Sequence, residues 1–123
     1  MVSQGYEQRL QGLVEIIPGA LYASLTGTDG IGIAFYQGGW RIDPILADAE
    51  FATMLSAATR AVKNLAVGGI SELIVATEKI TILIKMVGPD FYLSAGLALG
   101  AGNIGMARLQ MRRASDEFNK ILY

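Results

Sequence analysis

The first third of the chain changes from helical to alternating apolar spacing. Apolar residues recur every three or four positions over 3–17, and a Pro-Gly pair ends the helix that this spacing predicts. Over 20–26 the pattern alternates, and beyond Asp29-Gly30 it continues with Ile31, Ile33 and Phe35 on one face. Because an Asp-Gly pair favours a tight turn, the two alternating segments are predicted to form an antiparallel hairpin.

The middle of the chain predicts a long helix followed by three strands. The helix begins at Asp43-Pro44, a capping residue followed by a first-turn proline, and runs to about Ala66, where Gly68-Gly69 is expected to end it. The strands are predicted over 70–77, 80–87 and 91–99. Their short connections favour an antiparallel meander, and the apolar character of 80–87 on both alternating sets indicates that both sheet faces are covered.

The last helix begins near Asn103, a good N-cap, and turns an apolar stripe toward the core. The order of elements is thus helix, two strands, helix, three strands, helix, without an internal repeat or a linker. This order predicts one α/β domain over 1–123. We expect an α-β-β-α-β-β-β-α sandwich with one five-stranded antiparallel sheet covered by helices on both faces.

The long central helix carries two neighbouring arcs of different character. One arc is apolar and wide enough to pack on the sheet, with Phe51, Met54, Leu55, Ala58, Val62 and Leu65. The other arc, the small-residue stripe, consists of Ala49, Ala52, Ser56, Thr59 and Lys63. Four of these five side chains are small and uncharged, so a second helix could approach closely. An exposed Ala-rich helix is the alternative, and we favour the helix–helix interface.

The strand predicted over 70–77 is expected at a sheet edge beside the small-residue stripe. An unpaired edge of this length promotes aggregation unless it is covered, and pairing with the same edge of a second copy covers it. The sequence therefore predicts a homodimer. Its expected interface residues are Ala49, Ala52, Ser56, Thr59, Lys63, Ile70, Glu72 and Ile74.

The composition of the chain excludes the commonest catalytic machinery. Its 123 residues include no His and no Cys, which excludes Cys nucleophiles, Ser-His triads and ordinary zinc sites. We therefore expect no enzymatic activity, no cofactor and no metal, although Asp, Glu, Lys and Tyr chemistry stays open. The net charge of −1 disfavours a nucleic-acid partner. The longest uncharged run, 91–107, is too short and too glycine-rich for membrane insertion, and without a secretory signal a cytoplasmic location is expected.

Two short motifs suggest ligand sites but have simpler explanations. Residues 100–105 match the dinucleotide-binding pattern G-x-G-x-x-G, yet too few residues follow for the second strand that such a site requires. Three acids near the start of the central helix, Asp43, Asp48 and Glu50, could be imagined as metal ligands. Capping and the helix dipole already account for them.

Basic residues gather on the last helix at Arg108, Arg112 and Arg113. They could bind a phosphate or a partner, but Asp116 and Glu117 follow at helical pairing distance, so a solvated face is the favoured interpretation. Trp40, the only tryptophan, could anchor an interface or cover the sheet edge, and we favour the second.

Four fragments carry a resemblance to a known family. They are Pro18-Gly19-Ala20 before the first strand, Thr28-Asp29-Gly30 in the first hairpin, Thr77-Glu78 after the third strand, and Asn-Ile-Gly-Met-Ala-Arg over 103–108. In this order they resemble the Roadblock family, named for a type of dynein light chain, over nearly the whole chain. The resemblance implies a homodimer in which two sheets join edge to edge and the central helices pack antiparallel. It also implies binding to small GTPases, with no catalytic motif to carry over.

The predicted function is therefore that of a non-enzymatic homodimeric scaffold or regulator of a Ras-like small GTPase, as an adaptor or a GTPase activator. The alternative is a small-ligand sensor or a general protein-interaction module of the same fold class. A ligand sensor would require a pocket lined by polar groups, whereas the strands offer mostly Ile, Leu and Val. The sequence does not identify the GTPase or the direction of regulation.

Overall fold

The structure, a computed structural model, describes residues 2–100 and 103–123. Its elements are α1 (Val2–Ile16), β1 (Ala20–Gly27), β2 (Gly32–Gln37), α2 (Pro44–Leu65), β3 (Glu72–Ala76), β4 (Ile80–Val87), β5 (Phe91–Ala98) and α3 (Ile104–Leu122). The predicted order is confirmed. Among the described residues no helix is long and apolar enough to span a membrane.

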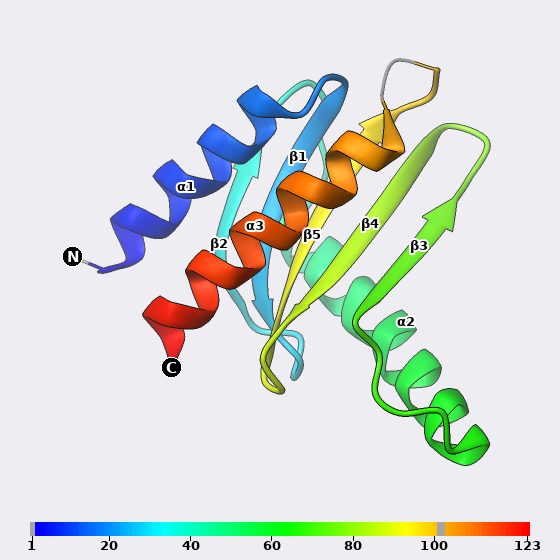
Figure 1. The fold of residues 1–123 in the computed structure, drawn as a ribbon. Helices are drawn as coiled ribbons and strands as arrows, with labels where there is room; N and C mark the ends of the chain where they lie inside the picture. The colour runs from blue at the N-terminus through cyan, green and yellow to red at the C-terminus, as the bar shows by residue number, and fades with distance from the viewer. Residues whose placement is uncertain (1, 101–102) are drawn as a thin grey trace.

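The five strands form one antiparallel sheet in the order β2-β1-β5-β4-β3. Helices α1 and α3 lie on one face and α2 lies alone on the other (Figure 1). The predicted sandwich and the edge position of β3 are both confirmed. Strand β3 is shorter than predicted, because Ile70 and Ser71 precede it.

The side chains of the central strands point alternately to the two faces of the sheet and belong to two separate hydrophobic clusters. The α1/α3-side cluster includes Leu10, Ile17, Leu25, Leu83, Leu93, Met111 and Phe118. The α2-side cluster includes Tyr22, Phe51, Leu55, Ile82, Ile84 and Tyr92. Strands β1 and β5 are buried on both faces, because they lie between helices above and below the sheet.

Strand β2 departs from the predicted alternation at Ile33. Leu25 of β1 pairs with Ala34 but Thr26 pairs with Gly32, so Ile33 is the extra residue of a β-bulge. Ile33 consequently packs on the α1/α3-side cluster and Phe35 on the α2-side cluster. The prediction that these two share a face was wrong, because the bulge shifts the alternation by one residue.

Helix α2 begins as predicted and ends differently. The Asp43 side chain accepts a hydrogen bond from the Ile45 amide at 3.0 Å, and Pro44 is the first helical residue. At the other end Ala66 adopts a left-handed conformation with φ of 56°, and its amide donates to the Lys63 carbonyl. The prediction that Gly68-Gly69 caps the helix was wrong, because the left-handed turn falls two residues earlier.

Candidate protein-interaction site along α2

The apolar arc of α2 extends past the protein's own core. Phe51 and Leu55 are buried, whereas Met54 and Val62 are half-buried and Leu65 is 69% exposed. The 22 residues of helix α2 span about 33 Å at 1.5 Å each. The sheet is narrower, because five strands about 4.8 Å apart cover about 19 Å between the outer strands. The C-terminal end of α2 therefore projects beyond β3 (Figure 1), and its Leu65 side chain is left exposed.

Among the residues that the structure describes, strand β3 pairs with β4 and with no second strand. Its side chains alternate between the two faces of the sheet. Leu73 and Val75 are half-buried and pack on the α2-side cluster. Glu72 and Ile74 pair with Lys85 and Leu83 and point to the opposite face, where Ile74 is 40% exposed.

The predicted interface residues are thus distributed over both faces. Ile70 lies before β3 and packs partly buried on the α2-side cluster. Glu72 and Ile74 lie on the α3 face, away from the small-residue stripe. They were grouped with the stripe because their strand was expected at a sheet edge beside it, and alternation along β3 turns them to the other face. Their place in a dimer interface stays a prediction.

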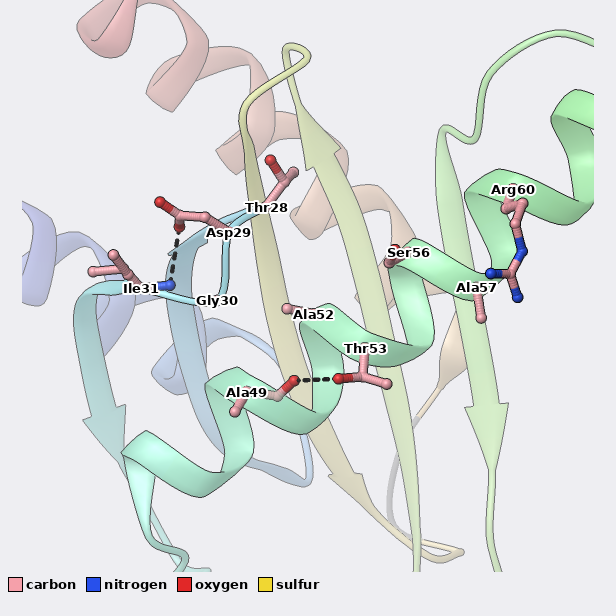
Figure 2. A pocket seen from close by; sticks show the side chains of 10 residues that line it. All are labelled: Thr28, Asp29, Gly30, Ile31, Ala49, Ala52, Thr53, Ser56, Ala57 and Arg60. Carbon is pink, nitrogen blue, oxygen red and sulfur yellow. Dashed lines mark hydrogen bonds between the residues drawn. The ribbon is translucent and has the colours of Figure 1, made fainter.

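The small-residue stripe lines one continuous groove along α2. Ala49, Ala52 and Ser56 face the turn between β1 and β2 across a hollow of about 580 Å³, to which Arg60 also contributes (Figure 2). An adjoining hollow of about 470 Å³ shares Ala52 and Ser56 and adds Thr59 and Lys63. We call these two hollows the α2 groove.

The protein's own hairpin explains part of the small-residue stripe. A Cβ atom placed on Gly30 would lie 3.6 Å from the Ala52 Cβ atom and 3.9 Å from the Ala49 Cα atom. Gly30 has a positive φ of 89°, and the turn is fixed by hydrogen bonds from Gly27 to Ile31 and from Gly30 to Gly27. Small side chains at 49 and 52 therefore admit this turn, whatever else they contact.

Buried polar groups hold α2 on the sheet, a feature that the sequence reasoning missed. Asp48 is 5% exposed and accepts a hydrogen bond from the Thr26 hydroxyl at 2.9 Å, while the Tyr92 hydroxyl donates to the Asp48 carbonyl at 3.1 Å. Burial raises the pKa of the Asp48 carboxyl, and the Thr26 hydrogen bond opposes that rise. The helix-dipole explanation of Asp48 was wrong, because this side chain points into the sheet. The signal in the sequence was that Asp48 lies seven residues, about two turns, before Leu55 and therefore on the same face of the helix as this core residue.

The glycine opposite Asp48 is required by this arrangement. A Cβ atom on Gly32 would lie 2.2 Å from a carboxylate oxygen of Asp48. The other two acids do not join it, since Asp43 caps the helix and Glu50 is exposed. Among the described residues no group of three acids is arranged to hold a metal ion.

Trp40 and the glycine-rich motif before α3 are the remaining candidate sites from the sequence. Trp40 packs on the α2-side cluster with its ring 5.5 Å from that of Tyr22, consistent with a covering role. Residues 101 and 102 of the G-x-G-x-x-G motif lie outside the described residues, and α3, which follows, is the last element. Asn103 caps α3 by accepting from the Met106 amide.

The charged residues of α3 pair with other elements. Arg108 forms an ion pair with Glu72 of β3, and Glu117 pairs with Arg9 of α1 at 3.1 Å. The expected pairing within the helix was wrong for Glu117, because α1 brings Arg9 to it. These two ion pairs connect α3 to β3 and to α1.

Comparisons with known proteins identify the fold. No protein-family model matches the chain, and no curated protein does so significantly. Among solved structures, Myxococcus xanthus MglB matches with a TM-score of 0.89 and 19% identity, over 98% of this chain and 89% of that one. A Roadblock/LC7 domain from Streptomyces avermitilis matches with a TM-score of 0.85 and 17% identity, over 94% and 96%. MglC from Myxococcus xanthus has 29% identity and a TM-score of 0.66, over 94% and 97%. The chain thus has the Roadblock/LC7 fold that its sequence resemblance predicted.

Proposed function

We propose that this chain is a non-enzymatic homodimer that regulates or scaffolds a Ras-like small GTPase. The observations that carry the dimer are the projecting end of α2, whose Leu65 is 69% exposed, and the edge position of β3 in the sheet. Exposed apolar surface next to a free strand edge is costly in a monomer. A second copy joined by twofold symmetry at β3 would remove both costs together.

In this dimer each α2 continues over the sheet of the other copy. Val62 and Leu65 would then pack against the half-buried Leu73 and Val75 of the second copy's β3, next to the seam. The small-residue stripe remains the predicted contact between the two α2 helices, with Ser56 exposed on it. The interface thus combines backbone pairing with helix packing, as obligate dimers commonly do.

The dimer is tested by solution mass. Light scattering at micromolar concentration should give about 26 kDa, twice the 13.1 kDa of the chain. Leu65→Glu should give a monomer, because it places a charge in the interface. Ile16→Glu, at a 54% exposed position on α1, is the matched control and should stay dimeric. A wild-type mass of about 13 kDa, or a dimeric Leu65→Glu, would refute this interface.

The small-residue stripe has its own test within the same assay. Ser56→Arg adds a long charged side chain at an exposed position of the α2 groove and should leave the monomer fold intact. If the two α2 helices cross at the stripe, this variant dissociates as Leu65→Glu does. A fully dimeric Ser56→Arg would move the helix crossing away from the stripe and leave β3 and Leu65 as the interface.

The GTPase partner is proposed from the Roadblock fold and from the chemistry of the chain. The sequence has no P-loop, no His and no Cys, so nucleotide chemistry has to belong to the partner. A regulator of this kind acts by binding the GTP and GDP forms with different affinity, since equal affinity shifts no equilibrium. Arg60, which lies outside the small-residue stripe and borders the groove near the β1–β2 turn, offers a charged group for such a contact.

Binding to small GTPases of the same cell tests this proposal. Each GTPase is loaded with GDP or a non-hydrolysable GTP analogue and passed over the immobilised chain, and single-turnover GTP hydrolysis is then measured with and without the chain. We expect one GTPase to bind in one nucleotide state by at least tenfold. Titration of GTP into the chain alone is the control and should give no binding. Tight GTP binding by the chain, or no state-dependent binding to any GTPase, would contradict the proposal and favour a ligand sensor.

A further inference from the structure

A second groove lies on the face of the sheet opposite α2. Basic side chains from two elements meet there: Lys85 from β4, and Arg108 and Arg112 from α3. The hollow measures about 340 Å³, and its remaining lining residues are Ser71, Glu72, Gly105 and Leu109. A second hollow of about 330 Å³ shares Ser71, Lys85 and Arg112 and extends along α3 to Asn119. We call the two hollows together the basic groove.

The basic groove exists because α3 does not cover the edge of the sheet. Helix α3 packs against β4 and β5 through Ala107, Met111 and Phe118. On this face of β3, beyond the reach of the helix, Ile74 stays 40% exposed. A channel is therefore left between the side of α3 and the sheet edge.

Two of its three cations are free to bind an anion. The Arg108 guanidinium is occupied by the Glu72 carboxylate. Within the described part of the chain, neither Lys85 nor Arg112 has an acid within salt-bridge distance, although Asp116 lines the far end. Lys85 is half-buried, so part of its side chain is held against its neighbours in the groove. The two free cations lie where the two hollows join.

We propose that the basic groove binds an extended segment of a partner protein that carries acidic side chains at its centre. From Gly105 to Asn119 the groove follows fourteen helical steps, or about 21 Å at 1.5 Å each. An extended peptide covers that length with about six residues at 3.3 Å each. Its central carboxylates would pair with Lys85 and Arg112, and the Ser71 hydroxyl, shared by both hollows, can donate a further hydrogen bond.

The charge of the molecule favours a peptide over other polyanions. Binding to nucleic acid draws on many phosphate contacts, and a membrane surface typically draws on four to eight basic residues. The basic groove offers three cations against Glu72 and Asp116, on a chain whose net charge is −1. A single short acidic segment matches that local excess.

The location of the basic groove gives this binding a distinct role. It lies across the sheet from α2, so a peptide there leaves the α2 groove and the proposed GTPase contact free. The chain would then hold two different partners on its two faces. This inference does not depend on the dimer, because every lining residue comes from one chain.

A labelled peptide provides the test. The probe is a fluorescein-labelled six-residue peptide with two central glutamates flanked by serines, and the matched peptide has glutamines there. We expect saturable binding of the glutamate peptide by fluorescence anisotropy at low salt, at least tenfold weaker for the glutamine peptide. Lys85→Gln with Arg112→Gln should weaken binding about five- to tenfold, as two solvent-accessible ion pairs allow. Amide NMR shifts on adding peptide should gather at Ser71, Lys85 and Arg112.

Control variants separate local binding from general charge. Arg113→Gln changes the same charge one residue along α3, but Arg113 lines a different hollow beside Arg9, and its binding should stay within twofold of wild type. Arg112→Gln alone, at an exposed position, guards against misfolding of the double variant. The monomeric Leu65→Glu should bind the peptide normally, so failure of the proposed dimer would not disturb this result. Equal losses in Arg113→Gln and Arg112→Gln would overturn the inference. So would Lys85- and Arg112-dependent binding of single-stranded DNA or phosphatidylserine vesicles but not of the peptide.

Discussion

Gly96 of β5 is the position where one added methyl group should most disturb the seat of α2. A Cβ atom there would lie 2.4 Å from Cε1 and 2.9 Å from Cδ1 of Tyr22, the residue opposite it on β1. The Tyr22 ring cannot easily move, because it is fully buried and stacks between Phe35 and Phe51. Its hydroxyl is also hydrogen-bonded to Ser94 at 2.5 Å. Gly96→Ala should therefore push the ring toward α2.

The size of the effect follows from three contributions. Overpacking a buried site costs about 1–3 kcal/mol, and weakening the Tyr22–Ser94 hydrogen bond adds about 1 kcal/mol. Alanine also restricts the unfolded chain more than glycine does, which raises the free energy of unfolding by about 0.4–1 kcal/mol. We expect Gly96→Ala to lower the free energy of unfolding by about 1–3.6 kcal/mol, a large part of the 5–15 kcal/mol typical of a domain. The urea midpoint should fall by about 1–2 M.

Gly12→Ala is the matched control for this prediction. Gly12 lies in the interior of α1, and a Cβ atom there would meet nothing within 4 Å. The same substitution should raise the free energy of unfolding by about 0.5–1 kcal/mol, because alanine favours helix over glycine. Both variants are unfolded in urea at one protein concentration, followed by far-ultraviolet circular dichroism and by Trp40 fluorescence, since Trp40 contacts Tyr22. A Gly96→Ala variant as stable as wild type would refute the reasoning.

Two further predictions concern α2 itself. The folded-state pKa of Asp48 lies above its ordinary value of 3.8, so the stability that Asp48 contributes is present below 3.8 and is lost as pH rises through the folded-state pKa. Asp48→Asn removes the buried charge and can still accept a hydrogen bond from Thr26, so it should be more stable than wild type at pH 7. In urea unfolding this difference in stability should shrink as the pH falls toward 4. A difference that does not change with pH would contradict the assignment. Ala66→Gly should raise the melting temperature, because glycine adopts the left-handed conformation of residue 66 without strain. The expected gain in the free energy of unfolding is about 1 kcal/mol. Ala61→Gly, inside the same helix at an exposed position, should lower it by a similar amount, and equal signs for the two would contradict the capping geometry.

Local signals in the sequence were sufficient for the elements and their order. The Asp-Gly turn, the Asp43-Pro44 helix start and the alternation of 80–87 each act within a few residues, so chain neighbours alone determine them. The covered sheet and the edge position of β3 followed from the same patterns. The resemblance carried by short fragments then led to the correct fold.

The details of α2 required the packed structure. Asp48 was assigned to the helix dipole, but the position of β1 decides that its carboxylate meets Thr26. For Ala49 and Ala52 a partner helix was favoured over an exposed Ala-rich helix, but the β1–β2 turn approaches both residues within the same chain. The arc ending at Leu65 was read as core, but the sheet ends before the helix does. None of these facts is encoded in spacing along α2.

The basic groove shows the same division between sequence and tertiary structure. The sequence placed Arg108, Arg112 and Arg113 together on α3 and determined their helical spacing. Only the tertiary structure brings Lys85 next to Arg112 in one hollow and pairs Arg108 with Glu72. It also places Arg113 in a different hollow. Helical and strand periodicity fix which side chains share a face of one element. Which face of another element lies opposite depends on the packing of segments distant in the chain, and that packing decides which charges are paired and which remain free to bind.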